Sequence, residues 1–211
     1  MNHFSIDQTK TWDRFYRANF INSLSGFKSA TLIGTMSKQG SPNLAIFSNL
    51  VHIGADPAMI GFINRPREAA PHTLANIEAT GVYTMNHIKA SFIEQAHQTS
   101  AKYAVGDSEF EKTGLGVEWN ANCKAPFVAE SDVKYSMELV EIIPIQYNGS
   151  FFVMGKVKDI FISKSIIDKD GFLHIEKAGS ITTLGIDGYY ETNLLARFRY
   201  AKPDTLIEKI N

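Results

Sequence analysis

The sequence has one cysteine, no long apolar run and no excess of charge of either sign. Cys123 cannot form a disulfide within the chain, and a zinc site built from several cysteines is excluded. No segment reaches the roughly 18 uncharged apolar residues that a membrane span needs. The N-terminus lacks a basic stretch followed by an apolar run, so we expect no signal peptide and a cytoplasmic location.

The charges balance almost completely, with 21 Lys and Arg against 22 Asp and Glu. Such a balance provides neither a basic surface for nucleic acid nor an acidic tail, so we expect no nucleic-acid partner and no membrane association. The 211 residues, 44% apolar and 20% charged, are typical of a soluble globular protein. We expect one domain over residues 1–211, onto which an aromatic-rich peripheral segment, residues 1–26, packs.

Most sequence motifs of enzymes are missing. There is no G-x-G-x-x-G after a predicted strand and no G-x-x-x-x-G-K-[ST], so neither a Rossmann dinucleotide site nor a P-loop is predicted. There is no H-E-x-x-H and no G-x-S-x-G, which argues against a zinc protease and an α/β-hydrolase. The six histidines do not fall at the spacing of metal ligands, so we expect no metal site.

Alternating and apolar runs bounded by turn residues predict six strands. They are predicted at residues 29–36, 43–53, 58–64, 82–88, 133–145 and 151–163. The Asn148-Gly149 pair between the last two is a strong hairpin signal. Successive hairpins predict a mainly β (α+β) fold, an antiparallel barrel with short helical insertions, rather than a parallel sheet.

Helices are predicted only in short pieces between these strands. Residues 74–80 predict one, with Thr73 as its N-cap and Gly81 as its stop. Ser91 and Glu94 have the spacing of a capping box, which predicts a helix over residues 92–103. Two further helical pieces are predicted at residues 108–114 and 174–180, and the rest of residues 104–130 is predicted to be irregular.

Small and polar residues interrupt the apolar pattern of the second predicted strand. Since side chains alternate along a strand, Asn43, Ala45, Phe47 and Asn49 share one face, and Ser48 lies on the other. One interpretation is an edge strand with a half-solvated face. The other is a strand whose small residues let a flat ligand approach the backbone, with amides and Ser48 bonding the ligand's edge.

The loop after the third predicted strand is rich in basic and polar residues. It contains Arg65, Arg67, His72 and Thr73 within nine residues. Arginine binds phosphate in a bidentate manner, and a helix N-terminus offers free N–H groups and the positive end of its dipole. A solvated basic loop and a phosphate site are both compatible with this pattern.

Three segments of the chain resemble the flavin reductase-like family, whose fold is the FMN-binding split barrel. They are SATLIGTMSKQGSPNLAIFSNLVHIGADPAMIGFINRP, PHTLANIEATGVYTMNH and FFVMGKVKDIFI. The resemblance extends from Phe27 to about Pro203. It implies a homodimer with FMN bound near the subunit interface.

The resemblance also implies where the parts of FMN lie. The isoalloxazine ring is expected along residues 43–49, and the phosphate in the basic loop. The residues expected to bind the cofactor on this basis are Thr35, Ser37, Asn43, Ala45, Phe47, Ser48, Asn49, Arg65, Arg67, His72, Thr73 and Asn86.

The function that the resemblance implies is hydride transfer from NADH or NADPH to bound flavin, and then to a small-molecule or protein electron acceptor. The cofactor carries this chemistry, so no catalytic acid or base is required of the protein. Two alternatives remain open, because a fold does not fix a function. One is an FMN-binding electron carrier or FMN store without NAD(P)H oxidase activity; the other is a binding module for haem or another planar ligand, with His52 as a candidate ligand.

Overall fold

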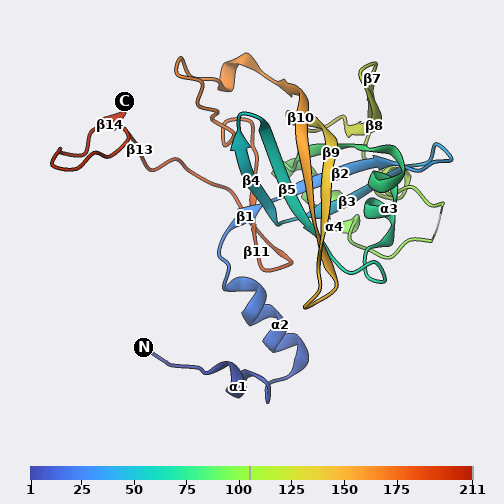
Figure 1. The fold of residues 1–211 in the computed structure, drawn as a ribbon, viewed down its shortest axis with the longest axis horizontal. Coiled ribbons are helices and arrows are strands. Elements are labelled where there is room, and N and C mark those ends of the chain that lie inside the picture. The colour runs from blue at the N-terminus through green and yellow to red at the C-terminus, as the bar shows by residue number, and fades with distance from the viewer. Residues whose placement is uncertain (105, 211) are drawn as a thin grey trace.

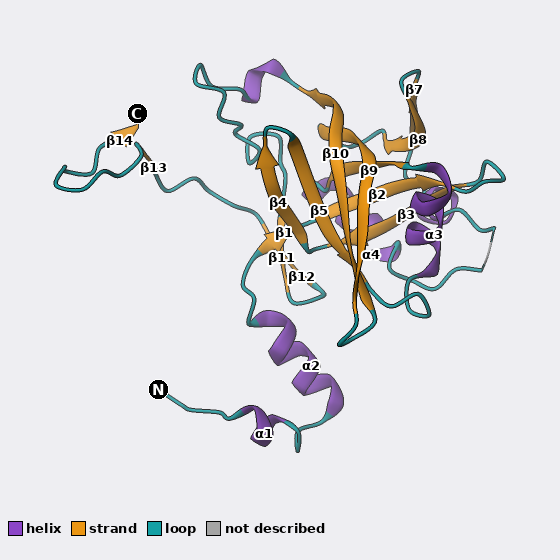
Figure 2. Cartoon of the chain, viewed as in Figure 1, coloured by secondary structure: helices purple, strands orange, loops and turns teal. Residues whose placement is uncertain are grey.

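A seven-stranded antiparallel sheet forms the body of the protein in the computed structural model, which describes residues 1–104 and 106–210 (Figures 1 and 2). The predicted mainly β, antiparallel architecture with short helical insertions is confirmed. In spatial order the strands are β3 (Pro42–Phe47), β2 (Thr31–Met36), β6 (Val82–His87), β9 (Val133–Ile145), β10 (Ser150–Ile162), β5 (Ala58–Asn64) and β4 (Leu50–Ala55).

The two edge strands of this sheet, β3 and β4, are consecutive in the sequence. Only Ser48 and Asn49 connect them. Three Cα–Cα steps of 3.8 Å span at most about 11 Å, so the two edges of the curled sheet meet at this corner and diverge away from it. The sheet is therefore a barrel that is closed at one corner and split along the rest of the β3 edge.

The prediction of one strand over residues 43–53 is wrong, because the chain changes sheet edge at Ser48 and Asn49. The Asn49 side chain bonds the backbone of Ile63 in β5, with Nδ2 3.0 Å from the carbonyl oxygen and the Ile63 N–H 3.2 Å from Oδ1. This carboxamide extends the β4–β5 ladder in place of a peptide group. Residue alternation cannot reveal such a corner, since it continues through both strands.

Helix α3 (Pro71–Thr80) packs against β2 and β3 and begins three residues before its predicted start. Pro71 occupies the first turn, where its fixed φ suits a helix, and Ala70 is the N-cap. The prediction of Thr73 as N-cap is therefore wrong, although Gly81 ends the helix in a left-handed conformation as predicted. Among the described residues, no side chain forms a capping hydrogen bond at the N-terminus of α3.

The predicted helix over residues 92–103 is much shorter in the structure. It consists of a 3₁₀ turn, Ala90–Phe92, and α4 (Ile93–Gln98). The hydroxyl of Thr99 donates to the carbonyl of Ala96 at 2.8 Å, a bond that competes with helix propagation. Residues 99–103 are thereby released as a loop.

The remaining elements are short, and most of them were not predicted. Residues 104–130, predicted to be largely irregular, contain the predicted helix α5 (Glu109–Thr113) but also the hairpin of β7 (Val117–Asn120) and β8 (Cys123–Val128). Residues 175–179 form turns, so the helix predicted at 174–180 is wrong. The others are a 3₁₀ turn at Lys164–Ile166, β1 (Lys28–Ser29), β11 (Thr182–Leu184), β12 (Gly188–Tyr190), β13 (Arg197–Phe198) and β14 (Lys209–Ile210).

Buried apolar residues form two main clusters on the two faces of β2. Ile33 belongs to the cluster that α3 covers, and Leu32 to the cluster that α4 and α5 cover. Period-two alternation along β2 predicts this division. The core thus fixes α3 on one side of β3 and α4–α5 on the other.

The two ends of the chain project from this body as arms (Figure 1). The N-terminal arm carries α1 (Ile6–Thr9) and α2 (Arg14–Ser23), and α2 has no buried residue. The expectation that residues 1–26 pack onto the domain is therefore wrong. Among the residues described, no helix combines the length and apolar character required to cross a membrane.

Candidate functional site

A pocket of about 650 Å³ lies beside β3, where the sheet is split. That volume is within the range of sites for drug-sized ligands and cofactors. The segments that line it come from β3 and its corner, the start of α3, the loop after α4, helix α5, and the β11–β12 hairpin. The residues that line it lie within the ranges 43–49, 63–73, 97–103 and 183–189, not every residue of which contacts the pocket, and at position 109.

The free edge of β3 faces the pocket with a defined set of backbone amides. The Leu44 N–H points away from β2, because it donates to the Glu109 carboxylate at 2.9 Å. Amides two residues apart in a strand point the same way, so the Ile46 N–H also points away from β2. Ile46 and Ser48 both line the pocket. The strand therefore offers an edge at which a planar ligand can be hydrogen-bonded.

Glu109 is an almost fully buried carboxyl group behind this edge. Burial raises the pKa of Glu109 above its ordinary value, and the hydrogen bond from Leu44 opposes that shift. The side chain reaches from α5 to β3 and fixes the position of the strand. It was not predicted, since 65 residues separate it from Leu44.

Ala45 and Phe47 provide the apolar part of the β3 wall. Ala45 is small, so a flat ligand can approach the strand closely there. The Phe47 ring packs edge-to-face on Phe62 with 4.9 Å between centroids, which holds it in place. This wall suits the face of an aromatic ring system.

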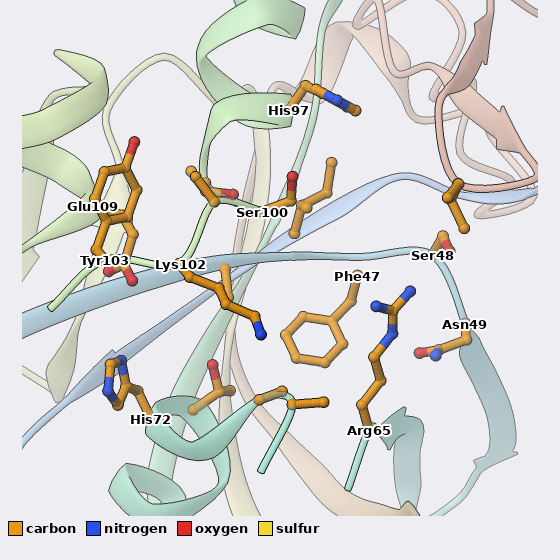
Figure 3. Close-up of a pocket in the computed structure, with 18 of the residues that line it drawn as sticks. Phe47, Ser48, Asn49, Arg65, His72, His97, Ser100, Lys102, Tyr103 and Glu109 are labelled. Atoms are coloured by element: carbon orange, nitrogen blue, oxygen red, sulfur yellow. The ribbon is translucent and has the colours of Figure 1, made fainter. Parts of the chain in front are cut away.

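Cationic and helix-terminal groups gather elsewhere in the same pocket. Arg65 and Lys102 extend into it and flank Phe47 in the view of Figure 3. Within the described part of the chain, neither cation has a carboxylate partner. The uncapped N-terminus of α3, with His72 and Thr73, lines the pocket as well. These groups can hold an anion.

Eight of the twelve predicted cofactor-binding residues line this pocket. They are Asn43, Ala45, Phe47, Ser48, Asn49, Arg65, His72 and Thr73. The side chains of Asn43 and Thr73 contact each other at 3.5 Å, which ties β3 to α3. The Asn49 side chain is occupied by its two bonds to Ile63, so only its backbone is available to a ligand.

The other four predicted residues do not line the pocket. Arg67 forms an ion pair with Glu78 and lies over the Phe151 ring, 4.9 Å from its centroid. The hydroxyl of Ser37 accepts the Ser41 N–H at 3.0 Å inside the turn before β3.

Thr35 and Asn86 are buried and bonded to protein groups. The Thr35 hydroxyl accepts from Asn43 and from Asn76, at 3.3 and 3.1 Å. The Asn86 side chain donates to the Leu32 carbonyl and accepts the Val128 N–H, at 3.1 and 3.0 Å. Both residues therefore hold strands together.

Several polar residues of the pocket were missed because they lie far along the chain. Lys102 follows α4 in a loop that was predicted to be helical. His97 and Tyr189 contact each other across 92 residues. No sequence motif marks any of them, and only the fold brings them to β3.

Comparison with known proteins decides the family. A family model described as "Flavin reductase like domain" matches residues 24–178. The chain belongs to the flavin reductase-like family. Its fold is the split barrel, and residues 179–211, including the β11–β12 hairpin, lie outside the part that the family model matches.

Individual proteins and structures are also similar to this chain. The chain is 46% identical to a Shewanella frigidimarina NCIMB 400 protein described as a flavin reductase with a split barrel domain, covering 95% of this chain and 100% of that one with a TM-score of 0.91. Nitrilotriacetate monooxygenase component B from Bacillus cereus is 17% identical, with 93% and 98% covered and a TM-score of 0.81, which shows the fold alone. A protein of Aquifex aeolicus strain VF5 is 28% identical over 155 residues, covering 72% of this chain and 78% of its own.

Proposed function

We propose that this flavin reductase-like protein binds FMN in the pocket beside β3. In this proposal it transfers hydride from NADH or NADPH to the flavin and then passes electrons to an acceptor. The observation that carries the proposal is that one pocket contains groups suited to a flat ring and groups suited to a phosphate. A free strand edge and a small-residue wall suit a flat ring. Arg65 and Lys102, which have no carboxylate partner among the described residues, suit a phosphate together with the N-terminus of α3.

The residues present fit FMN part by part. The amides of Ile46 and Ser48 suit the polar edge of the ring, and Ala45 and Phe47 suit its face. Arg65, Lys102 and the start of α3 at His72 and Thr73 suit the phosphate. Thr35, Ser37, Arg67 and Asn86 have no place in this proposal, because they lie outside the pocket.

When bound, FMN supplies the group that accepts and donates hydride. The side chains of the pocket then bind and orient it. The β3 edge would bond the polar edge of the ring, Phe47 and Ile63 would exclude water beside it, and Glu109 holds β3 in place.

The rival function is an FMN-binding electron carrier without NAD(P)H oxidase activity. The experiment that separates the two is anaerobic addition of NADH or NADPH to the FMN-loaded protein. Loss of the flavin's visible absorption supports the reductase, whereas reduction only by a protein donor would support the carrier.

The haem alternative loses its candidate ligand in this structure. His52 is exposed on β4 and does not line the pocket. A haem seated against β3 would therefore not be coordinated by His52.

We also propose that the protein is a homodimer of the cytoplasm. The two arms, which expose apolar side chains, support the dimer.

We further propose that the electron acceptor is a small molecule or a protein. The balanced charge of the sequence, without an excess of Lys and Arg, does not favour a nucleic-acid partner.

A further inference from the structure

The pocket has a second wall that the family model does not cover. Thr183, Ile186, Asp187 and Tyr189 line it from the β11–β12 hairpin, and the match to the family model ends at residue 178. The β3 wall belongs to the part that the family shares. The hairpin is therefore the part of the pocket in which this chain can differ from other members of the family.

The hairpin is held in place by the body of the protein. β11 pairs with β1, and Lys28 donates to the Gly185 carbonyl at 3.3 Å. Within the hairpin, the hydroxyl of Thr183 donates to the Gly188 carbonyl at 2.8 Å. These bonds fix Tyr189 relative to β3, as a wall that selects ligands by shape requires.

A side-chain hydrogen bond joins Tyr189 to His97 of α4, on the neighbouring side of the pocket. Its hydroxyl oxygen lies 2.7 Å from Nδ1 of His97, and the two rings pack edge-to-face with 5.8 Å between centroids. His97 extends from α4 into the region of the pocket shown in Figure 3. The contact ties the hairpin to α4.

The Tyr189 phenol can form a hydrogen bond to a ligand while it keeps its hydrogen bond to His97. A tyrosine hydroxyl donates one hydrogen bond and accepts others, so it can accept from the imidazole and donate into the pocket. Burial, with a smaller contribution from the Asp187 carboxylate, raises the pKa of Tyr189 above its ordinary value. The hydroxyl therefore keeps its proton and remains a donor at neutral pH.

We propose that the Tyr189 hydroxyl, positioned by His97, binds the second substrate of the pocket: a small planar compound with a carbonyl-type or nitro oxygen. This inference rests on the proposed function, in which FMN occupies the β3 wall. A donor that is fixed by a neighbouring ring recognises an acceptor oxygen, and the position of Tyr189, partly buried in the wall of a pocket of about 650 Å³, favours a small molecule over a protein surface. The carboxamide of a nicotinamide and the oxygen of an organic electron acceptor share this chemistry.

The test is the affinity of the FMN-loaded protein for two probes, measured by equilibrium titration without turnover. One probe is NADP⁺, which carries the nicotinamide carboxamide, and the other is menadione, a planar quinone. We compare the wild type with Tyr189→Phe, which keeps the ring and removes the hydroxyl. Loss of a single hydrogen bond to an enclosed ligand is expected to weaken one probe about tenfold, with FMN affinity unchanged.

Tyr190 offers a matched control on the same strand. It packs against Phe27 with 4.9 Å between ring centroids and does not line the pocket, so Tyr190→Phe is expected to bind both probes like the wild type. His97→Gln is expected to weaken the same probe as Tyr189→Phe, since it removes the imidazole that positions the phenol.

The probe whose affinity falls in Tyr189→Phe identifies which substrate supplies the acceptor oxygen. Weakening of NADP⁺ alone assigns Tyr189 to the nicotinamide, and weakening of menadione alone assigns it to the acceptor. Unchanged affinity for both probes in Tyr189→Phe would overturn the inference, as would an equal effect of Tyr190→Phe. A wild-type protein that binds no FMN would instead contradict the proposed function itself.

Discussion

Arg65 and Lys102 provide the sharpest prediction at the scale of single residues. Each is a cation in the pocket without a carboxylate partner among the described residues, and a charge-assisted hydrogen bond contributes about 1.5–3 kcal/mol. Replacing both with alanine is therefore expected to weaken FMN binding by at least about a hundredfold. Riboflavin, which lacks the phosphate, is expected to bind the double variant and the wild type equally.

Arg67→Ala is the matched control for this prediction. Arg67 is a nearby arginine that is paired with Glu78 outside the pocket, so its loss is expected to leave FMN affinity unchanged. The measurement is quenching of flavin fluorescence during titration with each protein. Equal loss of FMN and riboflavin in the double variant would place these cations at the ring instead.

The same residues show what sequence reasoning could and could not reach. Arg65 and the residues of β3 were predictable, because they lie in one continuous stretch with a recognisable pattern. Arg67 was assigned to the site because it is close to Arg65 in sequence, but Glu78 on α3 binds its guanidinium. Lys102 was missed because its place in the pocket depends on where α4 ends.

At the scale of elements, a charged cluster attaches the C-terminal strand β13 to the turn after β10. His174 bonds Asp168 and Glu176 at 2.9 and 2.8 Å, and Arg197 of β13 bonds Asp168 at 2.8 Å and stacks over Phe172. The hydrogen bond to Asp168, and then the one to Glu176, raise the pKa of His174 above its ordinary value of 6.5. The protonated imidazole therefore stabilises this attachment.

The sign of the pH dependence follows from the raised pKa. A histidine whose pKa is raised on folding stabilises the native state fully below 6.5, and this stabilisation is lost as the pH rises through the folded-state value. We expect the wild type to exceed His174→Gln in thermal stability at pH 5.5, and the difference to shrink toward pH 8.5. His52→Gln is the control substitution, because His52 is exposed and forms no ion pair with a described residue. A difference that grows with pH would contradict the assignment.

The elements themselves were predictable where one local pattern decided them. The hairpin of β9 and β10 follows from its alternating strands and the Asn148-Gly149 turn, and α5 from its short polar stretch. The corner at Ser48 and Asn49 was not predictable, because its cause is a side-chain bond to Ile63 in another strand. The early end of α4 likewise depends on a hydroxyl, that of Thr99, which local helix signals do not weigh.

At the scale of the whole molecule, both arms expose apolar side chains that a single copy leaves uncovered. Phe15 and Leu24 on the N-terminal arm are 72% and 66% exposed, and Leu195 and Leu206 on the C-terminal one are 96% and 95% exposed. The aromatic cluster around Trp12 gives the N-terminal arm a defined shape, with ring centroids 5.1–5.5 Å from its neighbours. Exposed apolar surface of this kind marks an interaction site.

We therefore expect deletion of residues 1–26 to weaken the proposed dimer. Light scattering after gel filtration should give the full chain twice its 23.5 kDa mass and the truncated chain a smaller average mass. Tyr147→Ser is the control, because Tyr147 is fully exposed in the turn between β9 and β10 and belongs to neither arm. A full-length chain that remains monomeric at all concentrations would rule out the dimer.

The most direct test of the central claim is the visible absorption spectrum of the FMN-loaded protein, recorded without oxygen before and after addition of NADPH and, separately, NADH. The account predicts a two-band flavin spectrum that bleaches with at least one of the two nucleotides. A spectrum that neither nucleotide bleaches would contradict the reductase function and leave an FMN-binding electron carrier. A protein that takes up no FMN would contradict the cofactor site itself.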